Sequence, residues 1–244
     1  MSLKGKTALV TGSSRGLGKA IALEFAAKGA KVAINYRASE GEANEVVKEI
    51  KAMGGEVLLV RANIGDAVQV KNLIDSITQK WGQLDILVNN AGITSQEKFA
   101  EIPVEKWNLI VNVNLNGSAY CAHAVLPQMI ARNSGVIINM SSILATRIQY
   151  SVVYGATKIA LERYTQGLAH ELRRTNISVT CMKPFFSKTE VVTEFLEGKM
   201  DMSDWEEPEM WGKYCTMMAD ADPQTTTGKI FDQALALKTF GPWR

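Results

Sequence analysis

The sequence has little of several residue types on which common classes of protein depend. Its three cysteines, Cys121, Cys181 and Cys215, lie far apart and form no CxxC pair. A disulfide framework or a zinc site is therefore not expected, and a reducing compartment fits the composition. The two histidines, His123 and His170, match no ligand spacing either. No bound metal is expected.

Long hydrophobic runs and an excess of one charge are also missing. No uninterrupted apolar run approaches membrane-spanning length, and the first apolar segment leads into a glycine motif, so neither a membrane segment nor a signal peptide is expected. Lys and Arg number 27 against 25 Asp and Glu, which gives a net charge of +2. This balance, with no basic stripe, predicts no nucleic-acid partner. A cytoplasmic protein is the expectation.

What the sequence does have is a regular alternation of apolar strands and amphipathic helices. Strand patterns occur at 7–10, 31–35, 57–60, 86–88, 136–140, 177–182 and near 229–231. Long helices are expected at 107–129 and around 154–172, and a last helix at 208–218. Strands that are apolar on both sides need cover on both faces, which predicts an α/β fold with a doubly wound, Rossmann-type parallel sheet. No linker divides residues 1–244, so we expect a single domain.

A glycine-rich turn follows the first strand and opens the first helix. Gly12 permits a tight exit from the strand, while Gly16 and Gly18 let the backbone approach a pyrophosphate at the helix N-terminus. Glycines also serve ordinary turns, but a strand, a glycine turn and a helix in this order favour nucleotide binding.

The end of the second strand bears on which cofactor is bound. An acidic residue there usually meets a free ribose 2′-hydroxyl, and an arginine meets a 2′-phosphate. Here Asn35, Tyr36 and Arg37 include no acid, and Arg15 lies nearby in the glycine turn. The pattern favours NADP over NAD, with ordinary surface arginines as the alternative.

Three further features carry candidate chemistry. Tyr154 and Lys158 lie one helical turn apart, and a nearby ammonium favours a phenolate and gives a tyrosine an acid/base role, although such pairs also occur on ordinary helices. The run Asn89–Gly92 ends a strand with small and amide residues, as a ligand-contacting turn or an ordinary turn would. Asn114 is flanked by apolar residues and should be buried and hydrogen-bonded, in either a packing or a functional role.

These pieces, in this order, resemble the short-chain dehydrogenase/reductase family across nearly the full length. The resemblance rests on the run Thr11–Gly18, the run Asn89–Gly92, Asn114, Ser142 and the pair Tyr154 and Lys158. The segment from Lys31 through Gly92 is most similar to members of the 3-oxoacyl-carrier-protein reductase type. The resemblance implies an oxidoreductase that interconverts a ketone and a secondary alcohol by hydride transfer.

The resemblance also implies roles for single residues. Tyr154 would be the general acid and base, Ser142 would hydrogen-bond the carbonyl oxygen, Lys158 would assist Tyr154 and bind the nicotinamide ribose, and Asn114 would hold a water that links Lys158 to a proton relay. The residues expected to contact the cofactor are Gly12, Ser14, Arg15, Gly16, Leu17, Gly18, Tyr36, Arg37, Asn63, Ile64, Asn90, Ala91, Gly92, Tyr154, Lys158, Pro184 and Thr189.

The sequence departs from the family pattern at several points. Ser142 and Tyr154 are 12 positions apart, one fewer than usual; Ser141 would restore the count, yet the Met-Ser-Ser context favours Ser142. Phe185 follows Pro184 where the family has glycine, and Asn63 replaces a frequent aspartate. The substrate lid, expected at about 185–210, is short, and the usual Asp-Gly-Gly near the C-terminus is absent.

The expected protein is an NADP-dependent oxidoreductase with a small carbonyl or alcohol substrate, similar to 3-oxoacyl thioester reductases. The alternative is a catalytically impaired scaffold or a regulatory subunit of an oligomer, which Phe185 and the short lid motivate. By resemblance alone, a homo-oligomer is expected, most simply a tetramer built on the two long helices that carry Asn114 and Tyr154.

Overall fold

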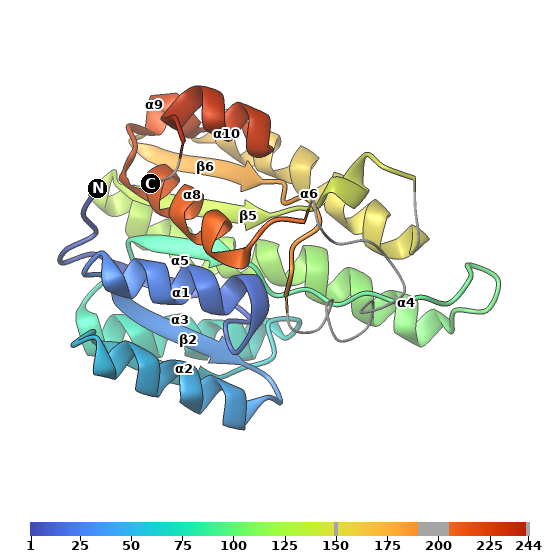
Figure 1. Ribbon diagram of the computed structural model, residues 1–244, viewed down its shortest axis with the longest axis horizontal. Coiled ribbons are helices and arrows are strands. Elements are labelled where there is room, and N and C mark those ends of the chain that lie inside the picture. The colour runs from blue at the N-terminus through green and yellow to red at the C-terminus, as the bar shows by residue number, and fades with distance from the viewer. Residues whose placement is uncertain (149–150, 190–204, 243–244) are drawn as a thin grey trace.

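The computed structural model describes residues 1–148, 151–189 and 205–242, and these ranges contain one seven-stranded sheet (Figure 1). Every pair of neighbouring strands in it runs parallel, in the order β3-β2-β1-β4-β5-β6-β7. The strands are β1 Thr7–Val10, β2 Lys31–Tyr36, β3 Val57–Arg61, β4 Ile86–Asn89, β5 Gly135–Met140, β6 Ile177–Met182 and β7 Ile230–Phe231. The predicted parallel, doubly wound sheet is confirmed.

Helices cover both faces of the sheet, as Figure 1 shows. On one face lie α1 (Gly16–Ala27), α2 (Glu40–Ala52) and α8 (Pro208–Asp220), and on the other α3 (Ala67–Trp81), α5 (Gly117–Arg132) and α6 (Val152–Glu171). Each face has its own core, with Phe25 and Trp211 fully buried in the first and Leu73 and Val125 fully buried in the second. Apolar burial on this scale is the main stabilising contribution to such a sandwich.

The strand order reverses between β1 and β4, which is the position where open α/β sheets bind ligands. The chain runs outward from β1 to β3, then returns to the other side of β1 for β4. At such a switch point the loops that follow the carboxyl ends of the two strands diverge to opposite faces and leave room for a ligand. The glycine turn follows β1 and the Asn-Ala-Gly turn follows β4, so both predicted motifs lie at this point.

The first of the two predicted long helices contains an irregular turn that the sequence pattern did not indicate. It starts as α4 (Val104–Val111), widens into a π-turn over Asn112–Asn116 and continues as α5. A Cβ on Gly117 would lie 2.7 Å from Ile64 Cδ1 and 3.0 Å from Ile64 O, so glycine permits a close approach to the chain after β3. π-turns inside helices often mark functional sites, and this one carries Asn114.

The C-terminal region is more structured than the sequence pattern predicted. Beyond α8 lie a short helix α9 (Pro223–Thr226), the edge strand β7 and a helix α10 (Gln233–Phe240), the last of which we did not expect. Phe231 of β7 is fully buried and stacks on Phe240. Of the predicted lid, residues 190–204 lie outside the described part of the chain. None of the described helices is long and apolar enough to cross a membrane.

Candidate active site

The turns after β1 and β4 are locked together by hydrogen bonds. Thr11 Oγ1 accepts hydrogen bonds from the backbone amides of Asn90 and Ala91, each at 3.0 Å. Asn90 Nδ2 donates to Thr11 O at 2.9 Å and to Gly12 O at 3.1 Å. A Cβ on Gly18 would collide with Asn90 Nδ2 and with Gly12 O. The glycine motif and the Asn-Ala-Gly turn therefore form one rigid unit.

The N-terminus of α1 is suited to a phosphate group. Gly12 and Gly16 have φ values of +62° and +56°, a region that favours glycine. The first turn of α1 contains no acidic residue, and Arg15 at the N-cap is exposed. Because the helix macrodipole is positive at this end, an anion is favoured here. Ser14 is buried in the turn, while Leu17 packs its partly buried side chain on the first core.

Thr189 lies against this motif although it is far away in sequence. A Cβ on Gly16 would lie 3.4 Å from the Thr189 methyl carbon, so the Thr189 side chain packs against the turn at Gly16. A small hollow of about 210 Å³ opens beside them, lined by Gly16, Lys19, Ala20, Leu23, Lys188, Thr189, Glu207, Pro208 and Glu209. The structure thus brings the predicted contact Thr189 to the glycine motif.

The two predicted arginines follow neighbouring strands: Arg15 lies in the turn after β1 and Arg37 directly after β2. Arg15 and Arg37 are both exposed, and Tyr36, the last residue of β2, is buried. Burial and the neighbouring carboxylate of Glu40 raise the pKa of Tyr36. Sequence reasoning missed Arg61, which pairs with Tyr36 across β2 and β3 and donates from Nε to Arg37 O at 3.2 Å. Its signal was a basic residue at the carboxyl end of the neighbouring strand.

Asn63 and Ile64 follow β3, on the loop that leads to α3. Asn63 Oδ1 accepts a hydrogen bond from the backbone amide of Gly65 at 3.1 Å, and the backbone amide of Asn63 donates to Gln69 Oε1 at 2.9 Å. Ile64 is buried against the second core. Asn63 is therefore held in a defined loop conformation, next to the carboxyl end of β3 that carries Arg61.

Lys158 and Tyr154 lie together on the first turns of α6. Lys158 is 3% exposed, and its Nζ donates to Met140 O at 2.7 Å. The same nitrogen is 5.3 Å from the centre of the half-buried Tyr154 ring. A Cβ on Gly92 would lie 3.6 Å from Lys158 Nζ and 3.5 Å from Asn114 Oδ1. The Asn-Ala-Gly turn, the π-turn and α6 thus converge on this ammonium.

Asn114 is buried and its side-chain amide is well used. Oδ1 accepts from the amide of Ile93 at 2.8 Å, while Nδ2 donates to Ile93 O at 2.9 Å and to Thr157 Oγ1 at 3.1 Å. Thr157 Oγ1 donates in turn to Tyr154 O at 2.8 Å. The amide therefore joins the chain after β4 to the turn of α6 that carries Tyr154. A water held by Asn114 would use its remaining acceptor capacity.

The two adjacent serines after β5 point to different partners. Ser141 is buried, and its hydroxyl donates to Glu162 Oε1 at 2.8 Å. Ser142 is only partly buried and caps a short 3₁₀ turn, Ile143–Ala145, by accepting from the amide of Leu144 at 3.2 Å. The Ser141 hydroxyl is thus committed to a buried acid, which agrees with the choice of Ser142.

The residues after β6 form an aromatic wall where the family pattern has a glycine. Pro184 is buried and its carbonyl accepts from the amide of Ile143 at 2.9 Å, which ties this segment to Ser142. The Arg147 guanidinium lies 4.8 Å from the centre of the Phe185 ring. Phe185 meets Phe186 edge-on at 5.2 Å, and Phe186 stacks on Trp205 at 5.0 Å. Phe185 therefore belongs to an ordered cluster beside the Ser142 turn.

Fold and site together define a class. A Rossmann-type sheet with a glycine cradle at its switch point, and a lysine and a tyrosine beside it, is the architecture of a nucleotide-binding oxidoreductase. The chain belongs to the short-chain dehydrogenase family, because the model for short chain dehydrogenase matches residues 6–199. It is therefore an oxidoreductase that acts on CH–OH and C=O groups.

Curated relatives and a solved structure extend the comparison. The chain is 39% identical over 199 residues to a 3-oxoacyl-acyl-carrier-protein reductase of Staphylococcus aureus, which covers 80% of this chain and 81% of the relative. It is 32% identical over 238 residues to the enzyme of the same name from Thermotoga maritima, which covers 94% and 96%. A short-chain dehydrogenase of Burkholderia cenocepacia in complex with NADP has a TM-score of 0.84 at 32% identity, covering 95% of this chain and 97% of that one.

Proposed function

We propose that this protein is an NADPH-dependent ketone reductase in which Tyr154 is the general acid, and the base in the reverse direction. The observation that carries the proposal is the position of Lys158 Nζ, 5.3 Å from the Tyr154 ring and next to Gly92 and Asn114. A buried ammonium beside a phenol favours transfer of the phenolic proton. The whole chain is proposed to fold as one domain.

The residues present fit a nicotinamide dinucleotide. Glycines that leave no room for a Cβ at Gly12 and Gly18, and a helix N-terminus without acids, form a cradle for a pyrophosphate. When bound, NADPH supplies the hydride. Ser142 would donate a hydrogen bond to the substrate carbonyl oxygen, and Tyr154 would deliver its proton to that oxygen as the alcohol forms.

The preference for NADP over NAD rests on charge in the turns after β1 and β2. Arg15, the N-cap of α1, and Arg37, which follows β2, are both exposed, and no acidic residue ends β2. Guanidinium groups form charge-assisted, bidentate bonds with phosphate, whereas a free 2′-hydroxyl needs an acceptor. The NADP complex of the Burkholderia cenocepacia neighbour supports the same preference.

The substrate is proposed to be a 3-oxoacyl thioester or a similar ketone. The names of the curated relatives support this class. In the structure, the partly buried rings of Phe185 and Phe186 follow Pro184, whose carbonyl is bonded to Ile143 of the Ser142 turn, and offer apolar surface there. An apolar acyl chain would lose its contact with water against such a surface.

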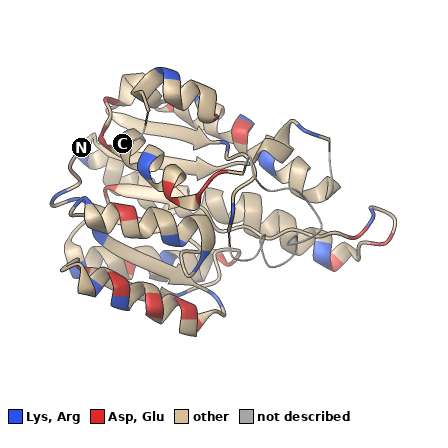
Figure 2. Cartoon of the chain, in the orientation of Figure 1, with Lys and Arg blue, Asp and Glu red and all other residues tan. Residues whose placement is uncertain are grey.

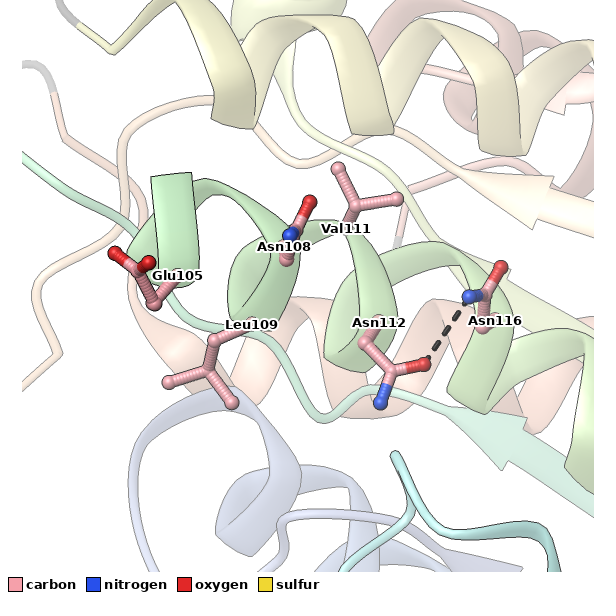
Figure 3. Close-up of a pocket in the computed structure, with 6 residues that line it drawn as sticks. All are labelled: Glu105, Asn108, Leu109, Val111, Asn112 and Asn116. Carbon is pink, nitrogen blue, oxygen red and sulfur yellow. Dashed lines mark hydrogen bonds between the residues drawn. The ribbon is translucent and has the colours of Figure 1, made fainter. Parts of the chain in front are cut away.

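Assembly and location are part of the proposal. The outer face of α4 and the π-turn carries an open hollow of about 420 Å³ (Figure 3), lined by Glu105, Asn108, Leu109, Val111, Asn112 and Asn116. Exposed Val152 and Ile159 occupy the outside of α6. We propose that these two helices pair with those of other copies in a homotetramer, and that the protein acts in the cytoplasm. Figure 2 shows Lys and Arg interspersed with Asp and Glu along the helices of the described part of the chain.

The deciding experiment follows oxidation of NADPH and NADH with a panel of ketones that includes a 3-oxoacyl thioester. Turnover that prefers NADPH and disappears in Tyr154→Phe would support the reductase. Turnover that prefers NADH would overturn the cofactor assignment and leave the acid/base assignment intact. Tight NADPH binding without turnover on any acceptor would favour a scaffold or regulatory subunit.

A further inference from the structure

Directly behind the proposed site lies a buried ion pair for which the reaction outlined above has no use. Glu162 of α6 and Lys183, the residue after β6, are joined at 3.2 Å, with side chains only 9% and 13% exposed. The other ion pairs among the described residues each have at least one partner that is more than 15% exposed. Glu162–Lys183 is therefore the most deeply buried pair in this part of the molecule.

Stability alone does not account for such a pair. Desolvation of two charges offsets most of their attraction, and apolar replacements of similar volume are often as stable or more stable. The charges of the pair act on the neighbouring Cys181. Burial and the Glu162 carboxylate raise the pKa of this thiol to about 12, while Lys158 and Lys183 lower the same pKa. The pair thus lies within electrostatic reach of the same thiol as Lys158.

The pair is connected to the segment that carries Ser142. Glu162 Oε1 accepts from Ser141 Oγ at 2.8 Å, and Ser141 N donates to Met182 O at 2.7 Å. On the other side of Ser142, the amide of Ile143 donates to Pro184 O at 2.9 Å. Met182 and Pro184 flank Lys183, so Ser142 is held between two bonds to the segment that Lys183 anchors.

Glu162 also belongs to α6, the helix that carries Tyr154, the proposed acid. Glu162 lies one turn beyond Lys158 on α6, and Lys158 O is 3.4 Å from the Ser141 hydroxyl. Three elements, β5, α6 and the segment after β6, therefore meet at Glu162. Hydroxyl, phenol and ammonium must be held within fractions of an ångström for efficient proton transfer, and supporting bonds of this kind provide that precision.

We propose that Glu162 and Lys183 are positioning residues: their ion pair, acting through Ser141, fixes the Ser142 segment relative to Tyr154 and Lys158. This inference rests on the proposed reductase function for its kinetic part. Its structural part stands on the hydrogen bonds alone.

The test compares three variants with the native protein. The double variant Glu162→Leu with Lys183→Met removes both charges and the carboxylate that accepts from Ser141, and Glu162→Gln keeps an acceptor of the same shape. The double variant Glu45→Gln with Lys48→Met is the control, because that pair lies on the exposed face of α2. Each is measured for kcat and KM with NADPH, for Tm, and for hydrogen–deuterium exchange at the amides of Ser141, Ile143 and, as an internal reference, Ile138.

A positioning role separates activity from stability. The apolar double variant is expected to keep its Tm, to lose about 10- to 100-fold in kcat with little change in the KM for NADPH, and to exchange faster at Ser141 and Ile143 but not at Ile138. In kcat and in amide exchange, Glu162→Gln is expected to fall between the apolar double variant and the native protein. The α2 control is expected to match the native protein.

Native kcat and native exchange in the apolar double variant would overturn the inference, and so would a loss of kcat that only parallels a loss of Tm. If the native protein reduces no acceptor, the reductase proposal fails, while the exchange at Ser141 and Ile143 still decides whether the pair holds the segment. Should the double variant not fold, Glu162→Gln provides the same readouts.

Discussion

The ammonium of Lys158 lies 5.3 Å from the centre of the Tyr154 ring while it donates a hydrogen bond to the carbonyl of Met140. Tyr154 and Lys158 come from one helix, whereas Met140 ends β5, an interior strand of the sheet. The lysine therefore joins the helix that carries the phenol to the strand that leads to Ser142. This link gives the proposed acid a fixed position relative to the turn after β4, where Gly92 lies beside the same ammonium.

Replacing Tyr154 by phenylalanine is expected to reduce kcat by about 10²- to 10⁴-fold, because it removes the proton donor and little else. NADPH affinity, measured by fluorescence titration, should change little. Tyr164→Phe is the matched control on the same helix, because Tyr164 packs against the second core, where burial raises its pKa to about 12. Full activity in Tyr154→Phe would contradict the proposed acid.

The double variant Arg15→Met with Arg37→Met is expected to raise the KM for NADPH by about 10- to 100-fold and to leave the KM for NADH nearly unchanged, because only NADPH carries the 2′-phosphate. Arg61→Met should have a smaller effect of the same sign, since Arg61 bonds to the backbone of Arg37. Arg173→Met, beyond the end of α6, is the control. Equal losses for both cofactors would show that the arginines do not read the phosphate.

Gly18 and Gly167 both lie in helices, yet alanine is expected to act on them in opposite directions. At Gly18 a methyl group collides with Asn90 Nδ2 and Gly12 O, so Gly18→Ala should lower the free energy of unfolding by about 1–3 kcal/mol and weaken NADPH binding. At Gly167 nothing lies within 4 Å, and alanine should raise that free energy by about 0.5–1 kcal/mol. Urea unfolding with and without NADPH measures both; a stabilised Gly18→Ala would refute the locked turn.

The buried cysteines predict a loss of stability in alkaline solution. Burial raises the pKa of Cys121 from 9.0 to about 12, so above pH 9 the unfolded chain releases a proton that the native state keeps. The free energy of unfolding therefore keeps its full value with respect to this thiol below pH 9. It decreases by about 1.4 kcal/mol per pH unit for one thiol as the pH rises from 9 toward 12. Urea unfolding of the native protein and of Cys121→Ala at a series of alkaline pH values should show a shallower decline in the variant. Identical slopes would contradict the shift.

Much of the fold followed from patterns that act locally. Strands such as β1, with Leu9 and Val10, are apolar on both sides, and helices alternate with the strands along the chain. A parallel sheet covered on both faces was therefore predicted, and it is confirmed. The glycine motif was recognisable because its spacing reflects the needs of one turn. The π-turn at Asn112–Asn116 was not predicted, because it depends on how Gly117 meets Ile64, a contact between distant parts of the chain.

The candidate site divides in the same way. Sequence alone determined the family resemblance, because the types of its motif residues and their order along the chain are sufficient for it. The catalytic roles of Asn114, Ser142, Tyr154 and Lys158 stay predictions that the resemblance implies. Only the tertiary structure decided that Ser141 turns toward Glu162, that Lys183 pairs with that same acid, and that Arg61 lies against Arg37. The physical reason is that these ion pairs and hydrogen bonds form between side chains from separate strands and helices. The spacing of residues along the chain does not indicate which of these side chains meet.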